Sequence, residues 1–380
     1  MVCAWQVPAR GRRGMTATGF RMDLEDLRKQ IDEIDARLVA LMNKRARYAV
    51  EVGKIKRETG EASVYRPARE REVFEQIAKA NNGPLPDHAL MAIWKEMMSG
   101  SLSLEKSLKV AYLGPEGSFS HLAALDKFGH SVELVAVRNI SSVFDQVARA
   151  TADYGIVPVE NTTGGGVRDT MECFLWVHGP VKVCAEMALP IHQNLLSKTT
   201  LDRVTKVYSK PQVFDQCRRW LTDSASQADL VAVGSTAEAA LLASRVEGTA
   251  AVGSEMAASV YGLDVLASTI EDNSQNQTRF LVLGRESAAR TGRDKTCLLF
   301  SVTHEAGALV EVLDIFRRYR LNMTKIESHP FPTKTWEYYF FVDIEGHAED
   351  ENVKDALAEA QRHCRQLEVL GSFPVAVTAE

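Results

Sequence analysis

The sequence predicts a multi-domain protein built from an all-helical segment, a two-lobed α/β segment and a ferredoxin-like α+β segment. Apolar residues recur at alternating spacings of three and four along residues 24–55, the pattern of a long amphipathic helix. Short β-like runs then alternate with helical stretches over residues 109–286, and residues 296–380 follow the order strand, helix, strand, strand, helix, strand. A chain of 380 residues has room for two or three such domains.

The bulk composition narrows the class of partner. The formal net charge of -5 argues against a dedicated nucleic-acid binder, and no apolar run reaches the roughly 18 residues that a membrane helix needs. The six cysteines are scattered without a CxxC pair, which indicates the reduced thiols of a cytoplasmic protein and gives no zinc signature. We therefore expect no metal, no cofactor, no nucleic acid and no membrane among its partners.

Residues 1–22 are predicted to form a disordered extension ahead of the first helix. Arg10, Arg12 and Arg13 are not followed by the apolar stretch of a secretory signal. Met15 and Met22 are alternatives to Met1 as the start of translation.

Residues 23–108 are predicted to be almost entirely helical. Gly60 is expected to end the first helix, a second helix follows Pro67, and a third spans about residues 87–106. A first helix near 50 Å long with one apolar stripe needs a partner, which predicts a homodimer or a higher homo-oligomer. The seam consists of Leu24, Leu27, Ile31, Ile34, Leu38, Leu41, Arg45, Tyr48, Val52 and Ile55.

Arg45 occupies a seam position that should be apolar. Because a buried unpaired cation costs several kcal/mol, an anion should face it. Lys56 lies about three turns further on, on nearly the same side of the helix. Arg28 precedes Arg45 by roughly 25 Å of helix, so in an antiparallel dimer it can reach the partner's cations instead. Two alternatives remain open: a polar residue that sets the register of a structural coiled coil, and a basic face for nucleic acid.

Four stretches of this segment resemble the all-helical chorismate mutases: LRKQIDEID (27–35), VGKIK (52–56), RPARE (66–70) and IWKEMMSGSLSLE (93–105). The resemblance implies an intertwined dimer in which both chains build each site. It implies that the site takes Arg28 from one chain and the following residues from the other: Arg45, Lys56, Arg69, Glu70, Ser101 and Glu105.

The residue types fit the rearrangement of chorismate, a dianion, to prephenate. A pericyclic reaction needs no nucleophile or metal, only a substrate held in its reactive shape and stabilised charge at the breaking ether bond. Arginines bind carboxylates and Lys56 can donate to the ether oxygen. Glu105 stands where some members have Gln and helps only if protonated, which predicts activity that leans to acid pH. Arg66 stands where some members have Asp.

The α/β segment carries polar, glycine-rich turns after its predicted strands. GPEGSFS (114–120) follows the first strand and ENTTGGG (160–166) follows the third; helix N-termini with Gly and Ser offer N–H groups to carboxylates, although each turn alone is most often structural. A mostly parallel sheet is expected. The predicted strands are 110–113, 132–137, 155–159, 181–189, 204–208, 230–233, 250–252 and 280–283.

With VPVENT (157–162), YSKPQVFDQC (208–217) and DNSQNQTRF (272–280), the GPEGSFS turn resembles prephenate dehydratase. The resemblance implies a site made of Asn161, Gln216, Thr278 and Arg279, with Glu160 and Phe280 beside them. Prephenate loses carbon dioxide and its ring hydroxide to give phenylpyruvate, and aromatisation drives the reaction. Thr278 is therefore expected to donate a hydrogen bond to the departing hydroxyl. Lys210 and Thr162 depart from the frequent His and Ser.

The last segment carries no clustered nucleophile, base or metal ligands. GALV (307–310) opens a helix and ESHP (327–330) ends a strand, and both resemble motifs of ACT-type domains that bind phenylalanine between subunits; plain packing of a helix start is the alternative. The implied effector residues are Gly307, Ala308, Leu309, Val310, Glu327 and Ser328, with His329 in place of the usual Arg. Feedback inhibition by L-phenylalanine is expected.

The order of the three resemblances is that of a bifunctional chorismate mutase–prephenate dehydratase. It divides the chain into residues 23–108, 109–286 and 296–380, with 287–295 as a linker. The alternative is a non-catalytic cytosolic sensor of a small molecule, with a two-lobed binding domain and a dimerising coil.

Overall fold

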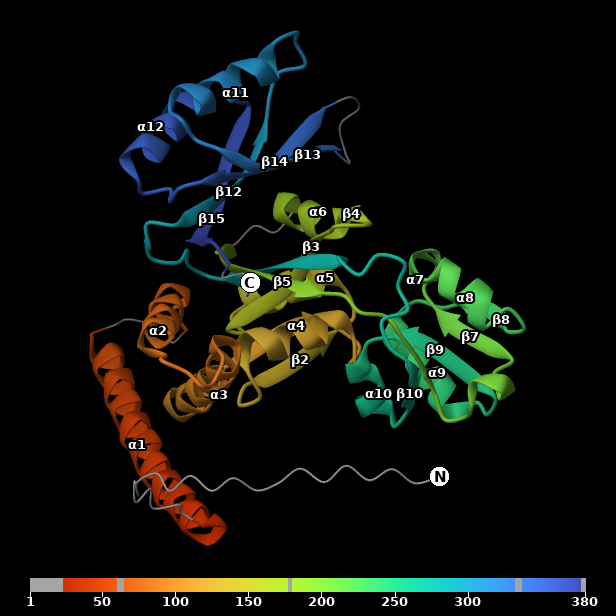
Figure 1. Cartoon of the computed structure of the whole chain (residues 1–380). Coiled ribbons are helices and arrows are strands. Elements are labelled where there is room, and N and C mark those ends of the chain that lie inside the picture. The colour runs from red at the N-terminus through yellow and green to blue at the C-terminus, as the bar shows by residue number, and fades with distance from the viewer. Residues whose placement is uncertain (1–22, 60–64, 177–179, 332–336, 377–380) are drawn as a thin grey trace, which may run out of the picture.

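The predicted three-part architecture is confirmed by the computed structural model, which describes residues 23–59, 65–176, 180–331 and 337–376. A helical arm, two α/β lobes and an α+β domain follow one another along the chain (Figure 1). The predicted extension at 1–22 and the predicted helix end at Gly60 lie outside the described residues. Within the described ranges, no helix combines the length and the apolar character needed to cross a membrane.

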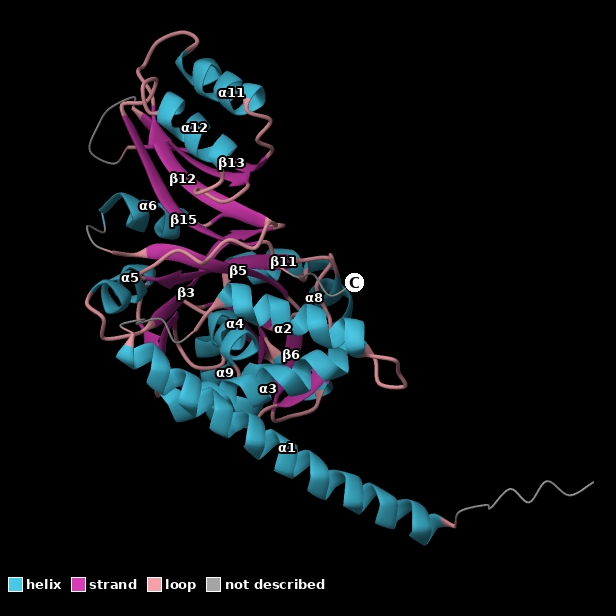
Figure 2. Ribbon diagram, turned by 90° about the vertical axis from the view of Figure 1, so that its left-hand side faces the viewer, coloured by secondary structure: helices cyan, strands magenta, loops and turns pink. Residues whose placement is uncertain are grey.

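Helix α1 (Leu24–Glu58) is a single helix of 35 residues. Its first turn is capped by Asp23, whose carboxylate accepts hydrogen bonds from the backbone N–H groups of Glu25 and Asp26. The apolar seam of α1 is exposed within one chain, with Ile31 at 56% and Ile55 at 59%. Helix α3 (Asp87–Glu105) packs beside its C-terminal half, and α2 (Pro67–Ala80) packs on α3 (Figure 2).

The first α/β lobe is a twisted sheet with the strand order β2-β1-β3-β11-β5, and β4 pairs with β3 at one end. Helices α4, α5 and α6 cover it. Its elements are β1 (Lys109–Leu113), α4 (Phe119–Phe128), β2 (Glu133–Val137), α5 (Ile140–Ala148), β3 (Tyr154–Asn161), β4 (Gly165–Gly166), α6 (Arg168–Trp176), β5 (Lys182–Pro190) and β11 (Gln277–Gly284).

The second lobe is a five-stranded sheet with the order β10-β6-β9-β7-β8. Its elements are β6 (Asn194–Ser197), η1 (Leu201–Arg203), β7 (Lys206–Ser209), α7 (Pro211–Gln216), α8 (Arg218–Ser224), β8 (Asp229–Ala232), α9 (Thr236–Arg245), β9 (Thr249–Gly253), α10 (Glu255–Tyr261) and β10 (Asp264–Ala267).

The prediction of a mostly parallel sheet is wrong. In the first lobe, β1 pairs in parallel with β2 and β3, but β11 is antiparallel to both β3 and β5. In the second lobe, β6 is antiparallel to β9 and β10. The reason lies in the connection between the lobes. The chain leaves the first lobe along β5 and returns along β11, so these neighbours run in opposite directions.

The C-terminal domain is a four-stranded antiparallel sheet, β13-β14-β12-β15, with two helices on one face. Its elements are β12 (Asp294–Ser301), α11 (Ala308–Arg318), β13 (Met323–Pro330), β14 (Tyr338–Glu345), α12 (Glu351–Ala360) and β15 (Gln366–Pro374). The other face shares one hydrophobic core with the first lobe, in which Leu299 and Phe341 are buried together with Leu281 and Leu283 (Figure 2). This shared core fixes the C-terminal sheet directly on strands β3 and β11 of the first lobe.

Candidate active sites

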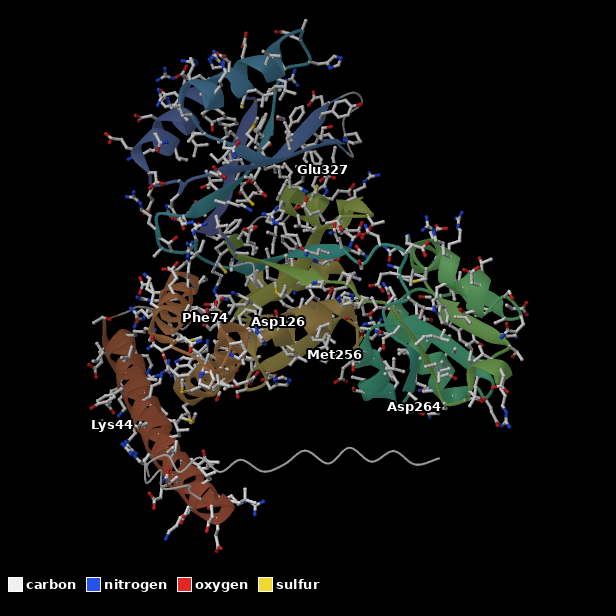
Figure 3. The ribbon with its side chains drawn as sticks, in the orientation of Figure 1. Lys44, Phe74, Asp126, Met256, Asp264 and Glu327 are labelled. Carbon is white, nitrogen blue, oxygen red and sulfur yellow. The ribbon has the colours of Figure 1, made fainter. Side chains whose placement is uncertain are left out.

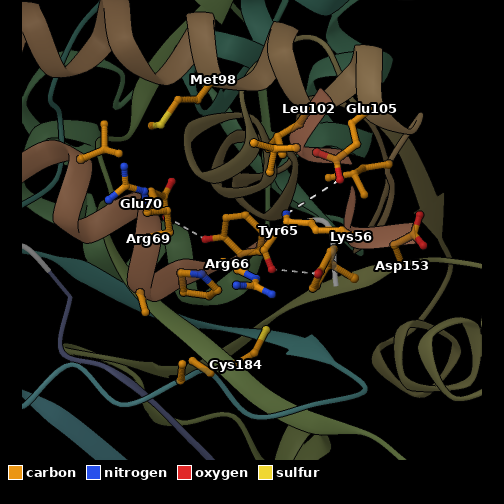
Figure 4. Close-up of a pocket in the computed structure, with 18 of the residues that line it drawn as sticks. Lys56, Tyr65, Arg66, Arg69, Glu70, Met98, Leu102, Glu105, Asp153 and Cys184 are labelled. Atoms are coloured by element: carbon orange, nitrogen blue, oxygen red, sulfur yellow. Dashed lines mark hydrogen bonds and ion pairs between the residues drawn. The ribbon is translucent and has the colours of Figure 1, made fainter. Parts of the chain in front are cut away.

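A cavity of about 810 Å³ lies between the three N-terminal helices and the edge of the first lobe (Figure 4). Six of the predicted mutase residues line it. They come from α1 (Arg45, Lys56), α2 (Arg69, Glu70) and α3 (Ser101, Glu105). The helices thus bring together side chains that are up to 60 positions apart in the sequence. The first lobe closes the cavity with residues that include Tyr154, Cys184 and Arg285.

Arg45 and Arg69 lie close enough in the cavity for their positive charges to repel each other. The Arg45 Nη1 atom donates a hydrogen bond of 3.1 Å to Ser101 Oγ, and Ser101 Oγ donates to the Met97 carbonyl at 2.8 Å. Burial, and then the nearby charge of Arg69, lower the pKa of Arg45. Both effects disfavour the charged form, and a bound anion would relieve both. The cavity is therefore suited to a small polyanion.

Glu105 lies against α1 because residue 53 is glycine. A Cβ atom on Gly53 would collide with Glu105 Cγ, so any larger side chain would displace the glutamate. The Glu105 carboxylate lies 3.8 Å from Lys56 Nζ, and the two side chains are only 7% and 16% exposed. Arg57 Nη1 also donates to the Glu105 backbone carbonyl at 3.2 Å. The amine and the carboxyl group thus face the cavity side by side.

Glu70 is held by two donors that the sequence did not suggest. Tyr65 Oη donates to Glu70 Oε2 at 2.8 Å, and Lys127 Nζ donates to the same oxygen at 2.7 Å. Burial, and then the neighbouring Glu70 carboxylate, raise the pKa of Tyr65 well above its usual value, so its hydroxyl stays a donor. Arg66 begins α2 as its N-cap residue and also lines the cavity.

Arg28 does not reach the cavity of its own chain. It is exposed near the start of α1 and is not among the residues that line the cavity. The straight helix puts it about 25 Å from Arg45. Of the seven predicted mutase residues, the single chain brings six together and leaves Arg28 apart.

A second polar cluster forms where β3 ends and β11 begins. Thr278 faces Asn161 in the ladder, and Asn161 Nδ2 lies 2.9 Å from Thr278 Oγ1 and 2.8 Å from Asn276 Oδ1. Asn161 Oδ1 accepts the backbone N–H groups of Thr163 and Gly164, which orients its amide. Asn276 is 1% exposed, and its Nδ2 has no hydrogen-bond partner among the described residues. Sequence reasoning missed Asn276 as a separate site residue, although it lies inside the DNSQNQTRF stretch.

Asn161 and Thr278 are direct partners in the ladder, so their side chains lie on one face of the sheet, next to a β-bulge. The register shifts between Arg279 and Phe280, so Val159 is the extra residue of β3. An extra residue reverses the alternation of the side chains that follow it. Gln216 ends α7 in the second lobe, where its carbonyl accepts the backbone N–H of Asp272 at 2.7 Å. It therefore meets the loop that leads to Asn276.

Arg279 is next to Thr278 in sequence but faces the C-terminal domain. Its guanidinium pairs with Glu186 at 2.7 Å, with Asp343 at 2.5 Å and with Glu160 at 3.3 Å. Burial alone would lower the pKa of Arg279, but the Asp343 and Glu186 carboxylates raise it well above its usual range. The structure therefore does not bring the Arg279 guanidinium to the Asn161–Thr278 cluster.

The two effector motifs lie on different elements of the C-terminal domain. Gly307, with φ +92°, precedes α11, which begins with Ala308, Leu309 and Val310; the Val310 side chain is 66% exposed. On β13, Glu327 points towards the first lobe and Ser328 points to the opposite face. Glu327 lies on the side of the C-terminal sheet that meets the first lobe (Figure 3) and pairs with Lys325 and His329 at 3.0 Å each. A Cβ atom on Gly166 would collide with the Glu327 carboxylate.

The GPEGSFS turn joins the two lobes. Ser118 Oγ caps α4, and the Gly117 N–H donates to His121 Nδ1 at 3.1 Å, so this donor is already used within the turn. Ser254 Oγ and Tyr261 Oη of the second lobe donate to the Gly117 and Glu116 carbonyls at 2.9 and 2.8 Å. The turn therefore holds the second lobe against the first.

A cation-lined cavity, a separate polar cluster and an attached ferredoxin-like domain define a multi-domain metabolic enzyme for small anions. Family models match the chain in the same order: chorismate mutase type II at residues 27–106, prephenate dehydratase at 110–288 and the ACT domain at 298–361. The chain belongs to the family of bifunctional chorismate mutase/prephenate dehydratases. The resemblances noted in the sequence are thereby confirmed.

Relatives with this name match over almost their whole length. The protein from Aquifex aeolicus (strain VF5) is 44% identical over 363 residues, which cover 94% of this chain and 99% of the relative. The protein from Stutzerimonas stutzeri is 41% identical and covers 93% and 98%. A crystal structure of prephenate dehydratase from Arthrobacter aurescens in complex with L-Phe is 30% identical, covers 72% of this chain and 93% of that one, and gives a TM-score of 0.65. These findings favour an enzyme over a non-catalytic sensor.

Proposed function

We propose that the cavity on α1, α2 and α3 converts chorismate to prephenate, and that the Asn161–Thr278 cluster converts prephenate to phenylpyruvate. One observation carries the proposal most directly: six predicted mutase residues line a single cavity of about 810 Å³. The proposed domains are the mutase at residues 23–108, the dehydratase at 109–286 and a regulatory domain at 296–380, with a linker at 287–295. The scattered cysteines, of which the described ones are free thiols, support a cytoplasmic location.

In the proposed mutase reaction, the protein holds its substrate and stabilises charge. Arg45 and Arg69 bind the carboxylates of chorismate. Lys56 donates to the ether oxygen as the C–O bond breaks and negative charge builds on it. Glu105 adds a second donor at this oxygen when its carboxyl group is protonated. Glu70 accepts a hydrogen bond from the ring hydroxyl.

The proposed site is complete only in a dimer. The exposed apolar seam of α1 is a surface that a second copy of the helix can cover. In an antiparallel arrangement, Arg28 of one chain lies beside Arg45 and Lys56 of the other. This arrangement supplies the seventh predicted residue, which the single chain keeps about 25 Å away.

In the proposed dehydratase reaction, decarboxylation and loss of the ring hydroxide leave an aromatic ring. The two electrons of the bond between the ring and the carboxylate carbon enter the ring as carbon dioxide leaves. The ring hydroxyl leaves as hydroxide with the electron pair of its C–O bond. Thr278 donates a hydrogen bond to this oxygen. Asn161, fixed by its contacts with Thr278 and Asn276, and Gln216 orient the substrate. Arg279 supports the reaction from the opposite face of strand β11, where its guanidinium is bound to three carboxylates.

L-Phenylalanine is the proposed feedback inhibitor, supported by the solved dehydratase relative that contains L-Phe. The proposed effector residues lie at the start of α11 and on the outer strand β13. Lys325 pairs with both Glu160 and Glu327, and Glu160 adjoins Asn161, so a change at β13 can reach the cluster. A ligand that favours one arrangement of the regulatory domains would shift activity by its difference in affinity. His329, in place of Arg, is expected to alter the sensitivity.

One coupled assay tests the proposed function. The full chain is given chorismate, and prephenate and phenylpyruvate are measured separately over time; prephenate is supplied alone in a parallel reaction. Both conversions are expected, and millimolar L-phenylalanine should slow the second. Binding of either substrate without turnover would instead support the sensor, and turnover of only one would mean that one site is inactive.

A further inference from the structure

The mutase cavity has a wall that comes from the dehydratase lobe. Helix α4 ends in Lys127 and Phe128, and both reach the helical segment. Phe128 packs on the Tyr65 ring with centroids 5.1 Å apart, and Tyr154 of β3 packs on the same ring at 5.3 Å. Tyr154 Oη also donates to the Tyr65 carbonyl at 3.2 Å. Tyr65 is therefore fixed by the dehydratase lobe just ahead of α2, the helix that carries Glu70.

Lys127 makes the second contact across this boundary. Its ammonium group donates to Glu70 Oε2 at 2.7 Å and lies 5.8 Å from the centroid of the Tyr65 ring. The Lys127 and Glu70 side chains are 18% and 14% exposed, so water screens this ion pair less than it screens a surface pair. Lys127 does not line the cavity, whereas Glu70 does. The lysine holds the glutamate from behind.

Both described donors to this carboxylate end on the same oxygen. Tyr65 Oη and Lys127 Nζ bind Oε2, and among the described residues no hydrogen bond ends on Oε1. A carboxylate has acceptor sites on each oxygen, so Oε1 keeps its capacity for a ligand in the cavity. With Oε2 fixed at two points, the direction of Oε1 is fixed as well.

We propose that Lys127 is a positioning residue for the mutase reaction, which the dehydratase lobe contributes by fixing Glu70 so that Oε1 meets the ring hydroxyl of the substrate. This inference rests on the proposed function of the cavity. It means that the two activities are joined physically: the mutase site is built partly by the domain that consumes its product.

The test compares Lys127→Met, Lys127→Arg and the matched control Lys95→Met in the full chain. Lys95 also joins the helical segment to α4, through a 2.8 Å ion pair with Asp126, but it does not line the cavity. Because a hydrogen bond to a charged group is lost, Lys127→Met should lower kcat/KM for chorismate by about tenfold or more, mostly through KM. Lys127→Arg keeps a charged donor and should recover most of the loss, and Lys95→Met should match the wild type. Dehydration of prephenate should be unchanged in all three.

A chorismate analogue with hydrogen in place of the ring hydroxyl separates positioning from general damage. With this analogue, Lys127→Met and the wild type should perform equally, because the contact that Lys127 serves is absent. An equal loss with both substrates, or no loss with chorismate, would overturn the inference. If Lys127→Met does not fold, Tyr65→Phe removes the other donor to Oε2 and should give a smaller loss of the same kind. Glu70→Ala, which removes the acceptor, distinguishes the two levels: if it leaves mutase activity intact, the proposed function of the cavity fails, whereas an impaired Glu70→Ala beside a normal Lys127→Met rejects only the role of Lys127.

Discussion

Replacing Arg279 with methionine should destabilise the protein strongly, because the change removes the counter-charge of a buried carboxylate. The Arg279 side chain is 13% exposed and pairs with three carboxylates between the first lobe and the regulatory sheet. Glu186 would keep Lys295 at 3.0 Å, and Glu160 would keep Lys325 at 2.5 Å. Asp343, with a side chain 0% exposed, has no other cation partner among the described residues. The variant therefore leaves one buried carboxylate without a counter-charge.

The expected cost of this change is about 3–5 kcal/mol, the usual penalty for removing one partner of a buried ion pair. That is a large part of the roughly 5–15 kcal/mol by which proteins are stable. Urea unfolding followed by tryptophan fluorescence measures the loss, and dehydratase activity at low urea reports whether the active site follows it. Adding Asp343→Asn to the variant removes the stranded charge and should recover part of the stability.

The double variant Arg279→Met/Asp343→Asn is the control for this prediction. If the free energy of unfolding of Arg279→Met lies within about 0.5 kcal/mol of the wild-type value, the range of an ordinary surface substitution, the ion cluster does not hold the interface. If Asp343→Asn brings no recovery, the loss does not come from the buried carboxylate, and the reasoning is refuted as well.

Two further predictions concern the dehydratase site and its contact with the regulatory domain. Thr278→Ala should reduce dehydration of prephenate by at least about tenfold and leave the mutase rate unchanged, because the hydroxyl lost is the proposed donor to the leaving oxygen. Separate assays with chorismate and prephenate check this, and an equal fall in both would reject the assignment. Burial raises the pKa of Glu160, but Lys325 and then Arg279 outweigh it and hold this pKa below the usual value of about 4.5. A lowered pKa in the folded state contributes stability above the unfolded value, and this stability is lost as the pH falls through the folded value. Thermal unfolding between pH 6 and 3 should therefore show a smaller acid-induced loss for Glu160→Gln than for the wild type, and parallel curves would contradict the prediction.

The long-range order of the fold was predictable because its signals are long. The heptad seam of α1 extends over nine turns or so, and the strand and helix order of the regulatory domain repeats familiar ferredoxin-like spacing. The short strands β6 and β10 were missed, although β7 and β8 have the same length and were predicted, so length alone does not decide which short strands a sequence reveals. Strand direction was also beyond reach, because alternating helices and strands do not reveal that β11 returns antiparallel beside β5.

The candidate site residues also divide into those that the sequence predicted and those that it did not. Lys56, Arg69 and Glu70 were predicted because each lies in a recognisable motif, and Arg45 because it interrupts the apolar seam of α1. Lys127 was missed because it lies 57 positions after Glu70, in a different domain and in an ordinary amphipathic helix. Arg279 was assigned to the same site as Thr278 because both lie in one motif, although neighbouring residues of a strand point to opposite faces of the sheet.

The central claim of the proposed mechanism is that two chains share each mutase site, and mixed dimers test it most directly. Arg28→Ala and Arg45→Ala chains should each be nearly inactive as mutases. When the two are unfolded together and refolded as a mixture, about half of the dimers carry one chain of each kind, and each of these has one intact site, so about a quarter of the wild-type activity should return. If the mixture stays as inactive as its components, Arg28 does not complete the site of a partner chain, and the shared cavity around Arg45 is wrong.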